Sequence, residues 1–415
     1  MAELPEQVDV VVIGAGPSGA IAAALLNRAG IKVLVLEREQ FPRFSIGESL
    51  LPQCMQYIEE AGFLPAVRDA GFQFKNGAAF AKGECGTYYN FEEKFTPGHG
   101  TTFQVERARF DKLLADQAQA QGVQIAFEHS VTAYREMDEG AVLDYQSAAG
   151  KTGQVVCRYV LDASGFGRVL PRLLDLEIPS DLPPRNAAFT HVNDHITDPE
   201  FDRNKVLIVV HPEHRDIWYW VIPLAGGKCS TGVAASPEQL AARGASSPLE
   251  LVQTMHAEVP QLQKLLQRAE WCYPANQLSG YSRNVKHLAT DRYALLGNAG
   301  EFLDPIFSSG ITIAMRSSSM AAKLVARQLA GETIDWRREY EAPLREGVDT
   351  FRVFVDAWYS GLFQDVIFFP NQAPSVREMI SSILAGYAWD KDNPFVAQSQ
   401  RRLNALGQFC ASESD

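Results

Sequence analysis

A glycine-rich turn near the start of the chain constrains the fold more than any other feature. The β-branched run from Val10 to Ile13 leads directly into Gly-Ala-Gly-Pro-Ser-Gly at residues 14–19. A helical pattern then covers residues 20–29, and a second apolar run, residues 32–36, ends at Glu37. Strand, turn, helix, strand and acid in this order are typical of a domain that binds a dinucleotide on a parallel sheet. The sequence therefore predicts an α/β fold that starts with a Rossmann-like domain.

The residues of this turn suit the ADP half of a dinucleotide. Gly14 permits the tight turn, Gly16 lets the backbone approach a pyrophosphate, and Gly19 lets the helix pack closely on the strand. The N-terminus of the helix holds phosphates, and the carboxylate of Glu37 can accept hydrogen bonds from ribose hydroxyls. A tight strand–helix turn without a ligand is the alternative. The predicted contacts are those of Gly14, Gly16, Pro17, Ser18, Gly19, Glu37 and Arg38.

The composition excludes several classes of protein. The 415 residues are 46% hydrophobic and carry a net charge of -12, so we expect a large core and no nucleic-acid partner. The six cysteines are scattered without paired spacing, which predicts reduced thiols in the cytoplasm. His191 and His195 have no third ligand at a suitable spacing, so no metal site is predicted. No secretory signal precedes the first strand, and no apolar run is long enough to cross a membrane.

Later apolar runs divide the chain into regions. The run from Val156 to Ala163 and the run from Tyr293 to Leu296 each end in a glycine turn, which predicts two further strands of the first sheet. The run from Phe72 to Phe80 alternates like one strand. The nucleotide-binding domain is therefore predicted to be discontinuous, with an inserted β-sheet substrate domain and a mostly helical C-terminal region. The predicted boundaries are 1–182 and 285–335 for the nucleotide-binding domain, 183–284 for the inserted sheet with its helices, and 336–415 for the helical region.

The three glycine turns, together with Arg107 on a predicted helix, resemble the FAD-binding pattern of the p-hydroxybenzoate-hydroxylase-like flavoproteins. The resemblance implies FAD as the cofactor, with Arg107 in contact with it and Asp304 near the ribityl chain. That family usually has an aspartate where this chain has Asn298. The sequence contains no second glycine fingerprint, so it does not indicate a separate nicotinamide domain. The other cofactor contacts that the resemblance implies are Asp162, Gly297, Gly310 and Ile311.

A second motif is Trp-Tyr-Trp-Val-Ile-Pro at residues 218–223. In a strand the side chains of Trp218 and Trp220 point to the same face, where two indoles form a bulky wall. Packing on the face of a sheet is the simplest explanation. The motif resembles the signature of flavin-dependent halogenases, in which it lies near the flavin and keeps the organic substrate away from it. It is also similar to a box of the geranylgeranyl-reductase-like flavoproteins, so the motif alone leaves both families open.

The segment from Phe302 to Gly310 resembles the halogenase motif Phe-x-x-Pro-x-x-Ser-x-Gly and leads into a predicted helix. Backbone N–H groups of Ser309, Gly310 and Ile311 at the start of that helix can bind an anion. The resemblance implies that a halide ion, chloride or bromide, lies there beside the flavin. A serine that caps the helix is the alternative. The predicted halide site is Ser308, Ser309 and Gly310.

Lys75 lies in a Lys-x-Gly-x-x-Phe setting that resembles the place of an essential lysine in halogenases. Flanking phenylalanines at positions 72, 74 and 80 would partly desolvate its amine, ease its deprotonation and let it capture a hypohalous acid. A solvated strand lysine whose stem covers apolar surface is the alternative. With the two other motifs, the predicted catalytic residues are Lys75, Trp218 and Trp220.

One position departs from the tryptophan-type halogenases, which place a glutamate where this chain has Phe307. The sequence Phe-Ser-Ser-Gly at residues 307–310 is more similar to the corresponding segment of the halogenases of phenols and of carrier-tethered pyrroles. The resemblance therefore implies an FAD-dependent oxidoreductase that uses reduced FAD, oxygen and halide to halogenate an electron-rich aromatic ring. It also implies a small aromatic substrate, free or presented by a carrier protein, and a separate flavin reductase.

Two other hypotheses stay open. The first is an FAD monooxygenase or a double-bond reductase of the same fold, for which Lys75 would be dispensable. The second is a flavin-binding protein that has lost its chemistry, for which Asn298 and Phe307 are the only indications.

Overall fold

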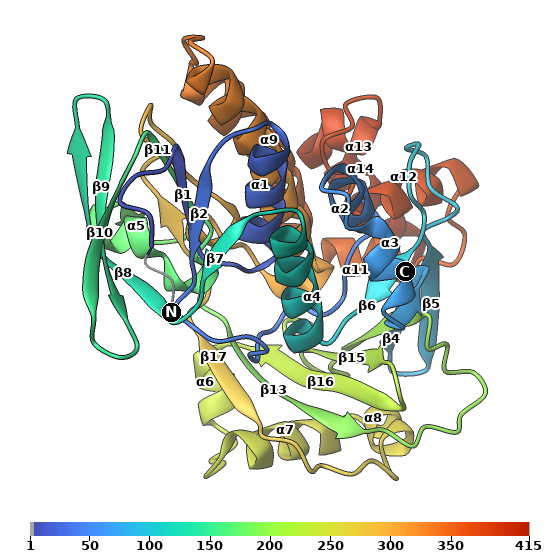
Figure 1. The fold of residues 1–415 in the computed structure, drawn as a ribbon. Helices are drawn as coiled ribbons and strands as arrows, with labels where there is room; N and C mark the ends of the chain where they lie inside the picture. The colour runs from blue at the N-terminus through green and yellow to red at the C-terminus, as the bar shows by residue number, and fades with distance from the viewer. Residues whose placement is uncertain (1–3, 415) are drawn as a thin grey trace.

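The computed structural model describes residues 4–414. A parallel sheet and a larger mixed sheet dominate the fold, with helices on their outer sides (Figure 1). The parallel sheet has five strands in the order β19-β11-β1-β2-β7, and the predicted glycine turn follows its central strand. Its strands are β1 (Val10–Ile13), β2 (Val33–Leu36), β7 (Gln124–Ala126), β11 (Tyr159–Asp162) and β19 (Tyr293–Leu295).

Helix α1 (Pro17–Arg28) packs on the parallel sheet and contacts two other helices. These are α4 (Arg107–Ala120) and α9 (Gly310–Leu329). Small alanine side chains fill α1 and let the neighbouring helices approach it, because a helix rich in alanine presents a thin surface. This packing brings residues near position 310 beside the glycine turn at the start of the chain.

The second sheet has seven strands in the order β17-β13-β16-β15-β14-β4-β5. One face is covered by α6 (Pro237–Ala241), α7 (Pro248–Ala257) and α8 (Pro260–Leu265), at the bottom of Figure 1. The other face turns toward the parallel sheet. Its strands are β4 (Gly77–Lys82), β5 (Cys85–Asn90), β13 (Asn186–Asn193), β14 (Lys205–Val210), β15 (Trp218–Leu224), β16 (Lys228–Ala235) and β17 (Asn276–Ser279).

Two runs that were predicted to be strands are strands in the structure, but each is divided into two strands at a single residue. The run from Phe72 to Phe80 splits at Asn76 into β3 (Gln73–Lys75), which pairs with β6 (Thr102–Gln104), and β4 of the seven-stranded sheet. The backbone of Asn76 bonds instead to Asn204 and Phe91. The run from Val156 to Ala163 splits in the same way at Arg158, whose N–H donates to the Asp9 carbonyl. Its first part is β10 (Thr152–Cys157), which joins β8 (His129–Met137) and β9 (Gly140–Ser147) in a separate antiparallel sheet.

The C-terminal region is mostly helical, as predicted, and packs beside β4 and β5 (Figure 1). Its aromatic side chains share an apolar core with Phe80, Trp218 and Phe307. Its helices are α10 (Ala342–Tyr359), α11 (Leu362–Phe368), α12 (Pro374–Leu384), α13 (Pro394–Ala397) and α14 (Ser399–Ser414). The remaining short elements are α2 (Cys54–Glu60), α3 (Leu64–Asp69), α5 (Val169–Leu173), β12 (Glu177–Ile178) and β18 (Asn284–Val285).

The mixed α/β architecture with a Rossmann-like parallel sheet confirms the predicted fold class. The domain boundaries given above stay a prediction. Between residues 4 and 414, no helix combines the length and the apolar character that a membrane span requires.

Candidate functional site

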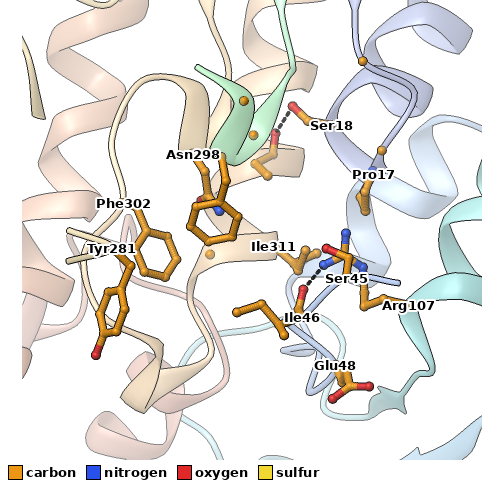
Figure 2. Close-up of a pocket in the computed structure, with 18 of the residues that line it drawn as sticks. Pro17, Ser18, Ser45, Ile46, Glu48, Arg107, Tyr281, Asn298, Phe302 and Ile311 are labelled. Carbon is orange, nitrogen blue, oxygen red and sulfur yellow. Dashed lines mark hydrogen bonds between the residues drawn. The ribbon is translucent and has the colours of Figure 1, made fainter. Parts of the chain in front are cut away.

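A cavity of about 470 Å³ lies between the carboxyl ends of the parallel strands and the inner face of the seven-stranded sheet. In a doubly wound sheet this edge is where ligands bind. The glycine turn lines one end of the cavity, and Trp218 and Trp220 line the other. Figure 2 shows some of the side chains that line the cavity, among which are Arg107, Asn298 and Ile311.

The glycines of the turn leave room for a cofactor on one side and for the protein backbone on the other. Gly14 has a φ of +97°, and a Cβ there would lie 2.7 Å from the Ala163 carbonyl oxygen. A Cβ at Gly19 would lie 1.9 Å from the Gly14 oxygen, so no other residue fits between strand and helix. Gly16 instead faces the cavity, and its closest neighbour, an Arg43 nitrogen, would lie 3.5 Å from a Cβ. These residues therefore fit the close approach of a pyrophosphate to the backbone.

Glu37 is buried at the end of β2 and faces the same end of the cavity. One carboxylate oxygen accepts a hydrogen bond from Ala15 N at 2.7 Å, and the other accepts one from Glu39 N at 2.9 Å. Each oxygen keeps a second lone pair for a ribose hydroxyl. Pro17, Ser18 and Arg38, which were also predicted to contact the cofactor, line the cavity as well.

Arg107 lines the middle of the cavity and is held in place by its own helix. Its guanidinium makes two hydrogen bonds with the carboxylate of Asp111, at 2.7 and 2.8 Å, and donates another to the Ile46 carbonyl (Figure 2). Arg43 also pairs with Asp111, at 2.9 Å. The sequence analysis missed Arg43 and Asp111, although the spacing of four residues between Arg107 and Asp111 is typical of a helical ion pair.

The predicted cofactor residues that do not line the cavity are Gly19, Asp162, Gly297 and Asp304. Gly19 lies beneath the turn, as described above. The carboxylate of Asp162 accepts hydrogen bonds from Ser164 N and Leu170 N, at 2.9 and 2.7 Å, and burial raises its pKa. Gly297 has a φ of +52°, and a Cβ there would lie 2.7 Å from the Cβ of Ala314 in α9. Asp162 thus holds the loop that follows β11, and Gly297 lets α9 pack closely against the loop that follows β19. Both loops form part of the cavity wall.

The first turn of α9 contributes the predicted halide residues. Ser308 has a positive φ of 55° and lines the cavity together with Gly310 and Ile311. Ser309 is 2% exposed and makes no side-chain hydrogen bond that caps the helix. The serine cap considered from the sequence is therefore absent at this position. The Oδ1 atom of Asn298 lies 3.8 Å from the point that a Cβ of Gly310 would occupy, so the amide also faces this turn.

Asp304 is buried beside the cavity in a chain of hydrogen bonds. Its carboxylate accepts bonds from the hydroxyls of Tyr359, at 2.9 Å, and Tyr281, at 3.4 Å, and from Ile306 N at 3.0 Å. The indole N–H of Trp218 donates to the Tyr359 oxygen at 3.0 Å. Burial raises the pKa of Asp304 to about 6. Asp304 itself does not line the cavity, whereas Tyr281, which the sequence analysis missed, does.

Trp218 and Trp220 lie on the same face of β15, as their spacing predicted, with ring centroids 5.6 Å apart. Both line the cavity, so they do more than fill the core. Gly232 lies opposite Trp220 on β16, and a Cβ there would lie 2.4 Å from the indole ring. The indole N–H of Trp220 donates to Ser230 Oγ at 3.3 Å. A small residue on the next strand is therefore what lets this indole lie against the sheet.

Lys75 is fully buried, which rules out the solvated lysine considered from the sequence. Its Nζ donates to Ser49 Oγ and to the Leu50 carbonyl, both at 2.7 Å, and lies 5.4 Å from the centre of the Phe91 ring. Burial lowers its pKa from 10.5 to about 7. Lys75 does not line the cavity, but Ser49 does. Phe74, expected to help bury it, is 42% exposed on the opposite face of the strand.

Other chemistry is not indicated in the described part of the chain. Residues 4–414 contain no group of three or more His, Cys, Asp or Glu side chains arranged to hold a metal ion. None of the six cysteines forms a disulfide in this part of the chain.

A model of the FAD-binding domain family matches residues 7–342, which is most of the chain. The chain belongs to the FAD-binding domain family. A crystal structure of a flavoprotein/dehydrogenase from Cytophaga hutchinsonii is 40% identical, with a TM-score of 0.95 over 99% of this chain and 100% of that one.

Two curated relatives of this chain are halogenases. One, from Pseudomonas fluorescens, is a chlorinase of 1H-pyrrole-2-carbonyl groups on a peptidyl carrier protein; it is 26% identical over 98% of this chain and 94% of its own length. The other, from Pseudoalteromonas luteoviolacea, is a brominase of the same group and is 28% identical over 92% of both chains. Membership of the family and these relatives confirm that the cofactor is FAD and that halide is used. They also confirm the prediction that the chain is an FAD-dependent oxidoreductase. They support the halogenase interpretation over the monooxygenase and reductase alternatives.

Proposed function

We propose that this FAD-dependent enzyme halogenates a pyrrole- or phenol-like ring, and that the residues described above carry the reaction. The observation that supports the proposal is one continuous cavity. It fits FAD at the glycine turn, ends at two indoles, and touches a buried amine through Ser49. An electron-rich ring suits a site with Phe307 rather than a carboxylate before the two serines, since such a ring needs less help to lose its proton.

Each part of the cavity then has a role. Bound FAD supplies the reaction of reduced flavin with oxygen, which oxidises halide to hypohalous acid. The glycine turn, Glu37 and Arg38 hold the ADP half, and Arg107 contacts the cofactor in the middle of the cavity. The N–H groups at Ser309, Gly310 and Ile311 hold the halide, because the positive end of α9 favours an anion. Asn298, which faces the same turn, can donate an amide hydrogen bond to the cofactor.

The indoles of Trp218 and Trp220 keep the aromatic substrate away from the flavin. Lys75 holds the hypohalous acid at Nζ and delivers the halogen to the ring, whose displaced proton leaves with hydroxide as water. An amine with a pKa of about 7 is partly neutral near neutral pH, so its lone pair is available for this step.

The proposal extends to the partners. Both curated halogenases named above act on a pyrrole group held by a carrier protein, so we expect a carrier to present the substrate here. A separate reductase supplies reduced FAD, since the sequence has no second dinucleotide fingerprint. The cysteines of the described chain are thiols and not disulfides, which favours the cytoplasm as its compartment.

The test supplies the protein with reduced FAD, oxygen, chloride or bromide, and a pyrrole-2-carbonyl group on a carrier protein or a free phenol. We expect a halogenated product, detected by mass spectrometry, that requires halide and is lost in Lys75→Met. Lys205→Met is the matched control. Lys205, the first residue of β14, is also mostly buried, but its amine pairs with the carboxylate of Asp202 at 2.6 Å. A product that forms equally without halide, or full activity of Lys75→Met, would overturn the proposal.

A further inference from the structure

Ser49 lies between Lys75 and the cavity. Lys75 is fully buried, and its Nζ makes hydrogen bonds with Ser49 Oγ and the Leu50 carbonyl. A carbonyl oxygen accepts a hydrogen bond but has no proton to pass on, whereas a hydroxyl both accepts and donates. Ser49 also lines the cavity, although only 4% of the residue is exposed. Ser49 is therefore the residue that both contacts the buried amine, through its hydroxyl, and lines the cavity.

We propose that Ser49 is a positioning residue that carries protons between Lys75 Nζ and the cavity. The ammonium gives one proton to Ser49 Oγ, the hydroxyl releases its own proton to a water in the cavity, and Lys75 is left as a neutral amine. The reverse transfer recharges it. The proton transfer itself does not depend on the proposed function. Only its purpose does, which is to make the amine neutral before it meets the hypohalous acid.

Another route from Lys75 is closed by the surrounding side chains. The titratable group that faces the amine is the thiol of Cys54 on α2. Burial raises the pKa of that thiol, so it stays protonated, and it makes a hydrogen bond with Thr312 Oγ1 at 3.2 Å. Neither Cys54 nor Thr312 lines the cavity. The Phe91 ring on the other side of the amine offers no exchangeable proton.

The backbone holds the Ser49 hydroxyl in place from both sides. Glu48 accepts a hydrogen bond from Val105 N at 2.7 Å, and Leu50 N donates to the Phe103 carbonyl at 3.2 Å. The Glu48 carboxylate also pairs with the His191 ring at 2.6 Å. These bonds do not involve the Ser49 side chain. A substitution of that side chain therefore removes the hydroxyl while the loop keeps its anchors.

The experiment measures how fast the Nζ protons of Lys75 exchange with water in the full-length, FAD-loaded protein. Lysine carries an isotope label for NMR, Lys75→Met assigns the signal, and the pH is kept below 7, where the ammonium form predominates. In Ser49→Ala we expect exchange to slow by about tenfold or more, because the hydroxyl that passes the proton from Nζ to the cavity is missing. Ser49→Thr, which keeps the hydroxyl, restores the rate.

Ser45→Ala is the matched control, because Ser45 lines the same cavity on the same loop and is expected to leave the Lys75 rate unchanged. An unchanged or faster exchange in Ser49→Ala overturns the inference, and so does a failure of Ser49→Thr to restore it. The exchange rate is read without any turnover. A lack of halide-dependent product would therefore count against the proposed function and not against the role of Ser49.

Discussion

Replacing Lys75 by methionine should stabilise the protein near neutral pH and destabilise it at high pH. The amine is fully buried, and its pKa falls from 10.5 to about 7. The folded protein therefore binds this proton less tightly than the unfolded chain does. The resulting cost to stability is fully present below about pH 7 and disappears as the pH rises toward 10.5. Methionine has a similar length and carries no charge, so it avoids this cost at every pH.

The magnitude follows from the same contacts. A change of pKa from 10.5 to about 7 corresponds to about 5 kcal/mol. Methionine gives up the attraction of the ammonium to Phe91, about 1 kcal/mol, and leaves the buried Leu50 carbonyl without its partner, which costs about 2 kcal/mol. The net gain is thus about 2 kcal/mol near pH 7. At pH values near 10.5 the folded amine is neutral, so the cost of the buried charge and the attraction to Phe91 are both gone. The variant is then less stable by about 2 kcal/mol, the cost of the unpartnered Leu50 carbonyl.

Urea unfolding of both proteins at several pH values between these limits measures the difference, and the expected result is a change of sign. Lys205→Met provides the reference, since it removes a lysine that is paired with Asp202 and should not stabilise the protein. A difference between Lys75→Met and the native chain that does not vary with pH would refute the reasoning. A loss of stability in Lys75→Met at pH 7 would refute it as well.

Three other predictions concern the cavity walls. Gly16→Ala should fold normally but bind FAD at least about tenfold more weakly in a fluorescence titration, because its Cβ enters the cavity without a clash inside the protein. Gly232→Ala should lower the melting temperature and shift tryptophan emission, because the new Cβ would lie 2.4 Å from the Trp220 ring and 2.6 Å from the Ala188 oxygen. Asp304→Asn should gain stability relative to the native chain as the pH rises from 4 to 7, by roughly 3 kcal/mol in urea unfolding. The folded pKa of Asp304, about 6, lies above the ordinary value of 3.8, so ionisation of the native side chain destabilises the folded protein over this range. Unchanged FAD affinity, unchanged melting, or a pH-independent difference would contradict them in turn.

The Rossmann-like part of the fold could be predicted because its signals are local. The turn at residues 14–19 and the apolar runs on either side specify strand, turn and helix within a short segment. The spacing of Trp218 and Trp220 likewise determined that both indoles share a face. The breaks at Asn76 and Arg158 could not be predicted in this way. A strand that leaves one sheet for another keeps its alternation, and only partners such as Asn204 and Asp9 show where the chain turns.

Much of the site depends on contacts between residues that are far apart in the sequence. Ser49 and Lys75 are 26 residues apart, and Asp304 and Tyr359 are 55 apart. Serine and tyrosine are common in any fold, and no spacing distinguishes the ones that contact a functional group. Motif resemblance could indicate Lys75 and Asp304, but the residues that hold them became visible only in the structure.

Strand β3 shows how a residue with a proposed function departs from the usual pattern of burial. Alternation correctly predicts that Phe74 and Lys75 lie on opposite faces, and hydrophobicity alone would bury the phenylalanine. The structure has the reverse, with Phe74 42% exposed and Lys75 fully buried. A fold that was selected for stability alone would exchange these two side chains, because the buried charge costs about 5 kcal/mol below pH 7. The neighbouring contacts to Ser49, Leu50 and Phe91 offset part of that cost, while burial lowers the pKa of the amine and so favours loss of its proton, as the proposed delivery of a halogen requires.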